Sequence, residues 1–356
     1  MKKIYDPYLI TIENALNKKK NVQLSKGFSN LGSLAGINNR GKFKVAQDSD
    51  FKPSSGMLSL SKLLGVAQSK NTQVGLHPDF AHLIKTRESE FHNITSTFID
   101  IKGSTSLYGE YDHEEVFIIT NTILSAAINT CHVFGGHIQR LQGDGVFTYF
   151  GGRTISEKDA LVHSLTSTSV FTYFVKNDLK RVFETHGIEN INTRIGIDIG
   201  NSHEDVMWAV TGTQECYELT TLSLHTSLAY KAQQKADPNA IIVGKHVKDK
   251  LPHLERFFIP VTSNNQFEDK FNYKLYNFDW FTYLKSIPFI KSTGLNELDF
   301  FENENTSNSE EQERLNRLRL ASVGGYVDKG GRINSQEGVV VEPNRFHYDK
   351  DSQKNK

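Results

Sequence analysis

The sequence has few of the features that mark secreted or membrane proteins. It contains two cysteines in 356 residues, Cys131 and Cys216, which is too few for a disulfide framework. Both lie in apolar or mixed segments, so we expect buried, reduced thiols. No uninterrupted apolar run of about 18 residues is present, and Asp6, Pro7 and Glu13 interrupt the first apolar segment. The sequence therefore predicts a soluble, cytoplasmic protein without a transmembrane helix or signal peptide.

Neither sign of charge predominates. Lys and Arg together number 41, as do Asp and Glu, which gives a net charge of zero. A balanced chain offers no electrostatic footprint for nucleic acid or an anionic membrane, and we expect neither as a partner. The 13 histidines include no HExxH motif and no pairing with cysteine at metal-ligand spacing, so zinc is not expected.

Three regions differ in composition. Residues 1–90 combine one short helical pattern with a Gly-, Ser- and Asn-rich stretch, which predicts an irregular N-terminal extension of unknown role. Residues 91–280 are rich in aromatic and β-branched side chains and form the predicted folded domain. Residues 281–356 are mostly polar and predict a partly flexible C-terminal tail.

Patterns of strands and helices alternate within the middle region. In chain order we expect a strand at 96–101, a helix at 114–136, a hairpin at 137–151, a helix at about 157–186, strands at 191–200 and 205–212, a helix at 218–234 and a strand at 240–244. The hairpin turns at Gly-Asp-Gly, a sequence that suits a tight turn. The order βαββαβ predicts an α+β fold with a ferredoxin-like core.

Two carboxylates stand at unusual places in this order. Asp100 lies within the apolar strand "FIDI", and Asp144 lies at the hairpin tip. A carboxylate in a strand centre is costly unless it is paired or binds a cation. The first strand of a βαββ unit lies beside the hairpin, so the two acids can converge, and two close carboxylates repel without a cation between them. Oxygen ligands of this kind suit Mg²⁺ or Mn²⁺. An edge strand with its acid in water, and an ordinary Asp-Gly turn, are the simpler alternatives.

The turn that follows Asp100 is a candidate phosphate site. It contains Gly103, Ser104 and Thr105 and precedes a predicted helix. Backbone N–H groups and hydroxyls in such a turn can bind a phosphate. For Arg194, at the start of a later strand, we expect a structural role.

Three segments in this order, "FIDIKGST", "GGHIQRLQGDGVFTYF" and "TRIGIDIG", resemble the class III nucleotidyl cyclases over residues 91–280. The resemblance implies a homodimer with composite active sites, in which Asp100, Asp144 and the backbone carbonyl of Ile101 hold two Mn²⁺ or Mg²⁺ ions. It also implies in-line attack of the ribose 3′-hydroxyl on the α-phosphate, with loss of diphosphate. Lys270 is similar to a lysine that holds the terminal phosphates, although a solvated charge is the alternative.

The sequence departs from the purine-specific members of that family. Arg140 stands four residues before Asp144, where adenylate cyclases carry a lysine. On the late helix, Ser223, Thr226 and Tyr230 align with the Asp or Thr, the Asn and the Arg of adenylate cyclases, and Lys231 is an alternative for the Arg. The Glu and Cys pair of guanylate cyclases has no match in this alignment.

Arg140 points to a pyrimidine base. An Arg fork donates hydrogen bonds and accepts none, which suits the O2 and O4 acceptors of uracil. The amino group of cytosine needs an acceptor that the sequence does not place, so we expect UTP to be preferred over CTP. This pattern resembles the pyrimidine cyclases of bacterial antiphage Pycsar systems, in which cyclic UMP or cyclic CMP acts on a downstream effector.

Four other functions remain open from the sequence. Adenylate or guanylate cyclases share the metal acids. A diguanylate cyclase also has an acidic hairpin, but "LQGDGVF" lacks the second acid of "GGDEF". A degenerate cyclase-like module would bind a nucleotide without turnover, and the missing late-helix Asn and Arg favour it.

Overall fold

The computed structural model describes residues 2–28, 53–63, 66, 73–188, 191–261, 273–287, 290–294 and 297–300, with three short strands at 326–327, 333–334 and 340–341. Lys270 and most of the Gly- and Ser-rich stretch lie outside the described residues.

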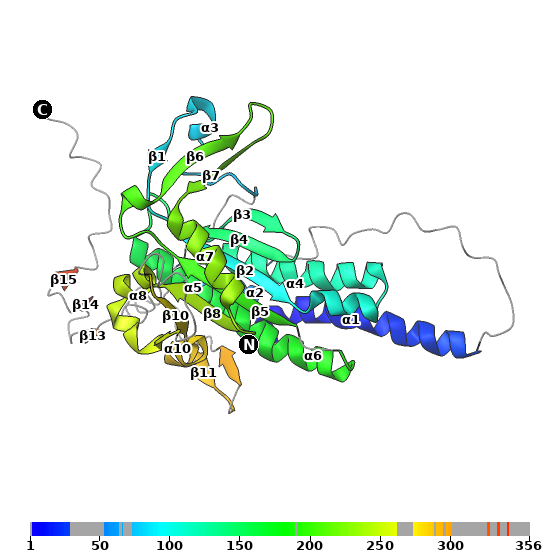
Figure 1. Ribbon diagram of the computed structural model, residues 1–356. Coiled ribbons are helices and arrows are strands. Elements are labelled where there is room, and N and C mark those ends of the chain that lie inside the picture. Colours follow the sequence, from blue (N-terminus) through cyan, green and yellow to red (C-terminus); the bar gives the residue numbers. More distant parts are fainter. Residues whose placement is uncertain are drawn as a thin grey trace, which may run out of the picture.

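A mixed sheet of seven strands forms the centre of the molecule (Figure 1). In spatial order its strands are β3 (His137–Gln142), β4 (Gly145–Phe150), β2 (Thr95–Lys102), β5 (Asn192–Asp198), β8 (Ala240–Gly244), β10 (Leu275–Phe278) and β9 (Phe258–Pro260). Strand β2 runs antiparallel to both β4 and β5, whereas β5 and β8 are parallel. The spatial order β3-β4-β2-β5, with helices after β2 and β4, is that of a βαββαβ unit. The predicted α+β, ferredoxin-like fold is confirmed.

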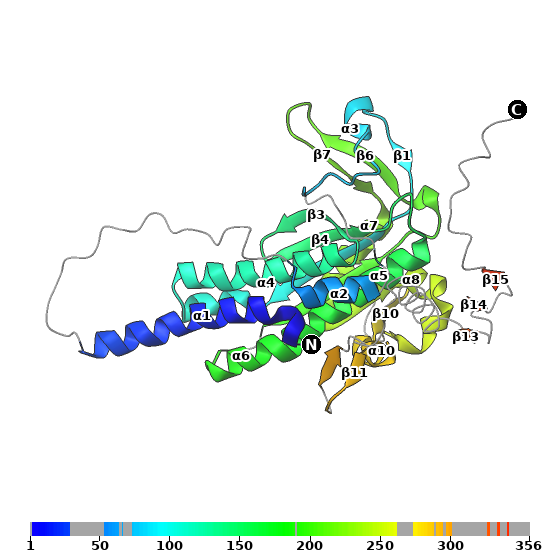
Figure 2. The same ribbon diagram turned by 180° about the vertical axis from the view of Figure 1, so that it is seen from behind.

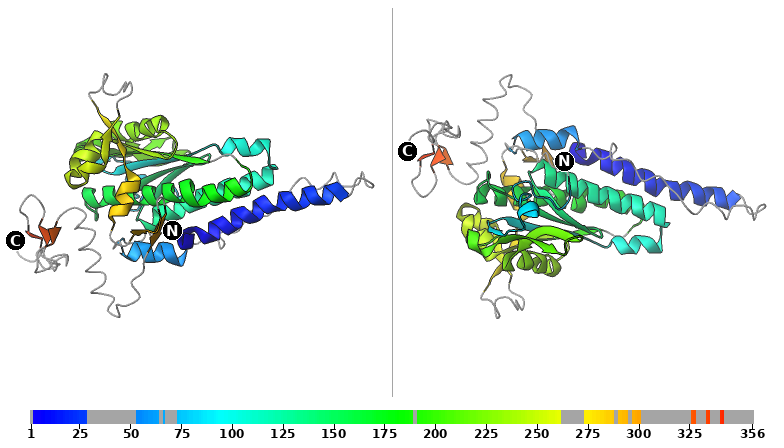
Figure 3. Two further views of the ribbon diagram at one scale, coloured as in Figure 1. Left: turned by 90° about the horizontal axis from the view of Figure 1, so that it is seen from below. Right: turned by 90° about the horizontal axis from the view of Figure 1, so that it is seen from above.

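Helices cover both faces of this sheet, in layers that are visible from below and above (Figure 3). On one face lie α4 (His113–Val133) and α5 (Glu157–Tyr173), which continues through a π-helical segment (Phe174–Leu179) into α6 (Lys180–Thr185). Helices α1 (Lys2–Phe28) and α2 (Ser55–Leu63) pack outside them (Figure 2). Helix α7 (Leu224–Lys235) covers the opposite face.

The remaining elements are short. They are α3 (Leu83–Thr86), η2 (Ser104–Gly109), η4 (His203–Asp205), α8 (Lys245–Lys250), η5 (Pro252–Phe257), α10 (Trp280–Ser286), β11 (Ile290–Ser292), β12 (Leu298–Phe300), β13 (Tyr326–Val327), β14 (Ile333–Asn334) and β15 (Val340–Val341).

Helix α4 is long and apolar enough to cross a membrane by length and composition alone. Half of its most apolar window is buried inside the molecule, however, and Val116, Ile119 and Ile123 belong to the main core. Asp112 and Glu115 form a capping box at its start, which stabilises the first turn. These contacts are those of a core helix.

Helix α1 belongs to the same core as the sheet. Tyr5 is fully buried and stacks on Phe174, with ring centroids 4.1 Å apart. Its hydroxyl lies 2.8 Å from the hydroxyl of Thr130 in α4. The predicted boundary at residue 90 stays a prediction, but α1 forms an ordered helix that packs on the domain rather than an irregular extension.

A second sheet of three strands lies beside β3 and β4. It consists of β1 (Glu90–Phe91), β6 (Met207–Gly212) and β7 (Tyr217–Leu222). The predicted helix at 218–234 is therefore wrong in its first third, because β7 pairs with β6 and the helix begins only after Ser223. The expected burial of both thiols is correct for Cys131 and wrong for Cys216, which is exposed at the β6–β7 turn.

Two histidines are buried between the sheets, and for His77 burial outweighs the nearby charge of Asp79, which favours protonation. His77 and His137 are each 3% exposed, and their ring centroids lie 5.0 Å apart. Burial lowers the pKa of His77 to about 4 and that of His137 to about 3. Within the described part of the chain, neither ring nitrogen of His137 has a hydrogen-bond partner.

These histidines predict a loss of stability in mild acid. Below the ordinary histidine pKa of about 6.5 the unfolded chain takes up protons that the folded chain excludes, so the free energy of unfolding falls with decreasing pH, by up to about 1.4 kcal/mol per pH unit for each group. His137→Leu should remove about half of the slope that the pair contributes. Urea unfolding followed by circular dichroism at pH 7.5, 6.5 and 5.5 measures it. His113→Leu, at an exposed position, is the control, and an unchanged slope in His137→Leu would contradict the assignment.

Candidate active site

Asp100 lies in a central strand and is paired across the sheet. Its partner in the register is Arg194 on β5, whose Nε donates to Oδ2 of Asp100 at 3.1 Å, while a second guanidinium nitrogen contacts the same oxygen. The two side chains are 25% and 29% exposed. Strand β2 has neighbours on both sides, so the edge-strand alternative is excluded. Arg194, for which a structural role was expected, forms the ion pair that satisfies Asp100.

Asp144 lies at the same end of the sheet. It follows Gly143, whose φ of 62° allows the tight turn between β3 and β4. The Ser104 hydroxyl donates to Oδ2 of Asp144. A Cβ placed on Gly145, the next residue, would lie 3.8 Å from Oδ1 of Asp100. The structure thus brings together the two acids that the sequence singled out.

The oxygen ligands at this end of the sheet fit a divalent cation that is shared with a substrate. Among the described residues, no group of three or more His, Cys, Asp and Glu side chains is placed to hold a metal ion. Mg²⁺ and Mn²⁺ need no such group, because they commonly bind one or two carboxylates together with substrate phosphates. Arg194 contacts only Oδ2 of Asp100. The Asp100 and Asp144 carboxylates and the Ile101 carbonyl are the residues that would hold the ions.

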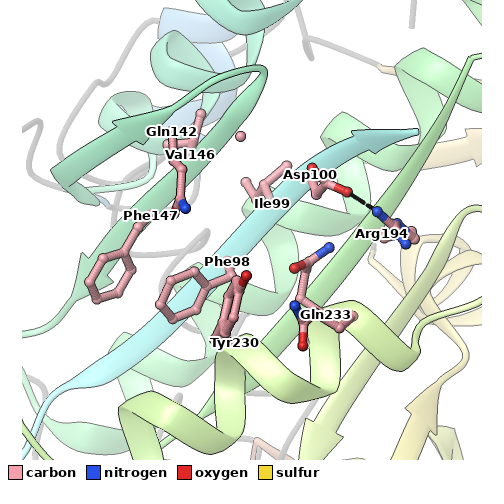
Figure 4. A pocket seen from close by; sticks show the side chains of 11 residues that line it. Phe98, Ile99, Asp100, Gln142, Val146, Phe147, Arg194, Tyr230 and Gln233 are labelled. Carbon is pink, nitrogen blue, oxygen red and sulfur yellow. Dashed lines mark hydrogen bonds and ion pairs between the residues drawn. The ribbon is translucent and has the colours of Figure 1, made fainter. Parts of the chain in front are cut away.

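A pocket of about 450 Å³ opens beside Asp100 and Arg194 (Figure 4). Its aromatic wall consists of Phe98, Phe147 and Tyr230: the Phe98 and Phe147 rings stack with centroids 4.1 Å apart, and Tyr230 meets Phe98 edge-on at 5.4 Å. The amides of Gln142, Gln233 and Gln234 also line it. One end of the pocket is therefore charged, and the other is flat and aromatic.

Helix α7 lies directly on β5 because Gly196 has no side chain. A Cβ at Gly196 would collide with the backbone of Ala229 and Gln233. At the first turn of α7, His225 Nδ1 lies 3.1 Å from the buried Asp198 carboxylate, which also accepts a bond from the Tyr273 hydroxyl at 2.6 Å. This attachment holds Tyr230 and Gln233 over the pocket.

Arg140 lies outside this pocket and pairs with Glu218 of β7. Its Nε donates to Oε1 at 3.1 Å, and a second nitrogen contacts Oε2. Gln139 Nε2 donates to the same Oε1 at 2.9 Å. The sequence did not identify Glu218, because residues 218–222 were expected to be helical. The alternating pattern of "YELTTL" was the signal that could have shown it.

The other candidate nucleotide-binding residues have partners within the chain. Ser223 caps α7, accepting from the His225 backbone at 3.1 Å and donating to the Asp205 carbonyl at 2.8 Å. The Thr226 hydroxyl bonds those of Ser96 and Thr221. Neither lines the pocket.

The candidate phosphate turn lies at the end of the sheet that carries Asp100 and Asp144. Gly103 has a φ of 99°, and Ser104 begins the short 3₁₀ helix η2. The Ser104 hydroxyl is engaged with Asp144, and Thr105 is exposed.

Comparison with known proteins gives the following relatives. No family model matches the chain. A cytidylate cyclase of Staphylococcus aureus is 35% identical over 228 residues, which covers 61% of this chain and 53% of the relative. A cytidylate cyclase of Escherichia coli is 31% identical over 238 residues, covering 61% and 50%. The adenylyl cyclase CyaB of Pseudomonas aeruginosa gives a TM-score of 0.47 at 19% identity, over 54% of this chain and 95% of that one.

The chain spans about half the length of the curated relatives it matches. They confirm the resemblance predicted from the sequence, which is to class III nucleotidyl cyclases of the pyrimidine type.

Proposed function

We propose that this protein cyclises a pyrimidine nucleoside triphosphate to a 3′,5′-cyclic nucleotide and diphosphate. The observation that carries the proposal is that Asp144 stands at the same end of the sheet as Asp100: Gly145, the residue after Asp144, lines the pocket together with Asp100 and lies beside its carboxylate. A volume of about 450 Å³ is within the usual range for small-molecule sites. The aromatic wall supplies a flat surface for a sugar or base.

In this proposal, one group of residues holds the metal ions and another binds the phosphates. Asp100, Asp144 and the Ile101 carbonyl would hold two Mn²⁺ or Mg²⁺ ions, which when bound supply charge neutralisation and activation of the 3′-hydroxyl. Arg194, beside Asp100, can donate to phosphate oxygens. The turn at Gly103, Ser104 and Thr105 would bind the phosphates through its N–H groups and hydroxyls.

The relatives favour a pyrimidine substrate, because both are named cytidylate cyclases. The sequence favoured UTP, since it placed no acceptor for the amino group of cytosine. Both triphosphates are therefore candidates. On the resemblance to Pycsar cyclases, we propose that the product is a cytoplasmic second messenger in antiphage defence and acts through a downstream effector.

We further propose a homodimer with composite sites. The resemblance implies that the metal ligands come from one chain and the groups that recognise the base come from the other. Exposed apolar side chains along β7 and at the start of α7 support an interface: Tyr217, Leu222 and Leu224 are 44%, 49% and 47% exposed. In this arrangement Arg140 serves the site of the partner subunit.

A degenerate module that binds without turnover is the second candidate. Tyr230 packs against Phe98 at the position expected for the catalytic arginine of the family, so Tyr230 does not replace that arginine and Lys231 is the remaining candidate on the helix. Both metal acids are nevertheless present, and Arg194 supplies a guanidinium at the same end of the pocket.

Removal of either acid should abolish turnover. Asp100→Ala and Asp144→Ala each delete a carboxylate that would hold the ions, so product formation should fall by at least a hundredfold. The pure protein is incubated with Mn²⁺ and each of the four nucleoside triphosphates, and the products are separated chromatographically. Asp237→Ala, at an exposed position, is the control. Near-full activity in either variant, with circular dichroism unchanged, would place the metal site elsewhere. A wild type inactive with all four would favour the degenerate module.

Mixing two inactive chains tests the composite site. Asp100→Ala lacks a metal ligand and Arg140→Ala lacks the base-recognising cation, so a mixed dimer has one site with all its groups. Activity should recover as one variant is titrated against the other, to about a quarter of the wild-type level at equal amounts if chains exchange at random. Exchange is verified with differently tagged chains. No recovery despite exchange would indicate a site built within one protomer.

A further inference from the structure

We propose that Arg140 and Glu218 act together to recognise the Watson–Crick edge of cytosine. This inference rests on the proposed function and names its substrate as CTP. It departs from the preference for UTP, which depended on the absence of an acceptor beside Arg140. Glu218 is that acceptor.

A bulge in β3 directs two adjacent side chains to one carboxylate. Neighbouring residues of a regular strand point to opposite faces, yet Gln139 and Arg140 both donate to Glu218. The register of β3 against β4 shifts between Ile138 and Arg140, which leaves Gln139 unpaired in the ladder. Such an irregularity re-aims a side chain. Two residues therefore share one partner.

Glu218 is held rigidly although it is partly exposed. Gln139 is only 1% exposed, and its Nε2 also donates to the Leu219 carbonyl at 2.7 Å. The amide is thereby fixed against β7. The Glu218 side chain, by contrast, is 30% exposed, and that of Arg140 is 49% exposed. On its buried side the pair is held by Gln139, and on its other side both charged groups are accessible to solvent.

Glu218 and Arg140 have more acceptor and donor sites than their contacts with each other and with Gln139 use. A carboxylate offers about four acceptor sites and an arginine five N–H donors. Three contacts use the acceptors of Glu218: two on Oε1, from Gln139 and Arg140, and one on Oε2 from Arg140. An acceptor site on Oε2 is left beside the remaining donors of Arg140.

Among the bases, cytosine matches this set. Its edge presents an amino donor at N4 and then acceptors at N3 and O2, and acidic side chains accept from the cytosine amino group in other recognition sites. Uracil presents an acceptor at O4 opposite the carboxylate and a donor at N3 opposite Arg140. Adenine matches the first two positions but has no third acceptor. Guanine presents the O6 acceptor opposite the carboxylate and the N1–H and N2 donors opposite Arg140, so it is mismatched at all three positions.

Arg140 also lies on the face of the central sheet that carries the aromatic wall of the pocket. In the register Arg140 is opposite Phe147, and Phe147 is opposite Phe98. Directly opposed residues in an antiparallel sheet share a face, so Arg140 continues the row whose Phe147 and Phe98 form part of the aromatic wall of the pocket (Figure 4). In the proposed dimer, Arg140 of one subunit would face the site whose metal ligands come from the other subunit.

The test exchanges the carboxylate for an amide of the same shape. Glu218→Gln can donate to O4 of uracil and no longer presents only acceptors to the cytosine amino group. We expect the wild type to prefer CTP over UTP by about 10- to 100-fold in kcat/KM, and the variant to lower that ratio at least tenfold. ATP is measured in parallel. Glu184→Gln, which removes the charge of an exposed carboxylate paired with Lys180, is the matched control and should keep the wild-type ratio.

Binding separates this inference from the proposed function. Affinities of 3′-deoxy-CTP and 3′-deoxy-UTP, which cannot be cyclised, are measured by calorimetry with Mn²⁺ for the wild type and Glu218→Gln. A wild type that binds the cytidine analogue more tightly, with the preference lost in the variant, supports the pair even if no triphosphate is turned over, in which case the proposed function fails alone. A preference for the uridine analogue, or a ratio unchanged in Glu218→Gln, would overturn the assignment of Glu218.

Discussion

The ion pair between Asp100 and Arg194 is the interaction on which the candidate site depends. A carboxylate in a central strand would be strongly unfavourable if it lost its partner, and the cross-strand guanidinium satisfies it without using Oδ1. The same pair faces the pocket. The compensation for placing an acid in the sheet therefore also places a cation where a triphosphate would lie. In the proposed function, this one contact would both satisfy Asp100 within the sheet and contribute to the binding of a metal–nucleotide complex.

The position of α7 is the second constraint. Gly196 allows the helix backbone to approach β5, and the buried Asp198 binds both His225 and Tyr273. These contacts lie at the end of β5 opposite Arg194. A single strand thus carries the Asp100 partner at one end and the helix anchor at the other, so the charged end of the pocket and its aromatic wall keep a fixed separation.

The sequence allowed the prediction of the elements whose pattern is local and strong. The apolar strand around Asp100, the Gly-Asp-Gly hairpin and the long helices have clear periodicity, and their order specifies the ferredoxin-like sheet and the approach of Asp144 to Asp100. It did not predict β7, because "YELTTL" runs directly into a helical pattern, and because the sheet containing β7 also depends on β1, more than a hundred residues away. The pairing of Arg194 with Asp100 was not predicted for the same reason: the two residues are distant in sequence. Lys270 lies outside the described residues.

The carboxylates proposed to hold the metal ions and the carboxylate proposed to contact the base lie on different sheets. The carboxylates belong to the central sheet and its hairpin, whereas Glu218 belongs to the smaller sheet and meets Arg140 only because β3 carries a bulge at Gln139. The position of Arg140, four residues before Asp144, can be read from the sequence. Its partner Glu218 cannot, because the two residues are far apart in the chain. A substitution in β7 can therefore change the hydrogen-bonding pattern offered to a base and leave Asp100 and Asp144 in place. In the proposed function, metal binding and the acceptor for the base therefore depend on strands of different sheets.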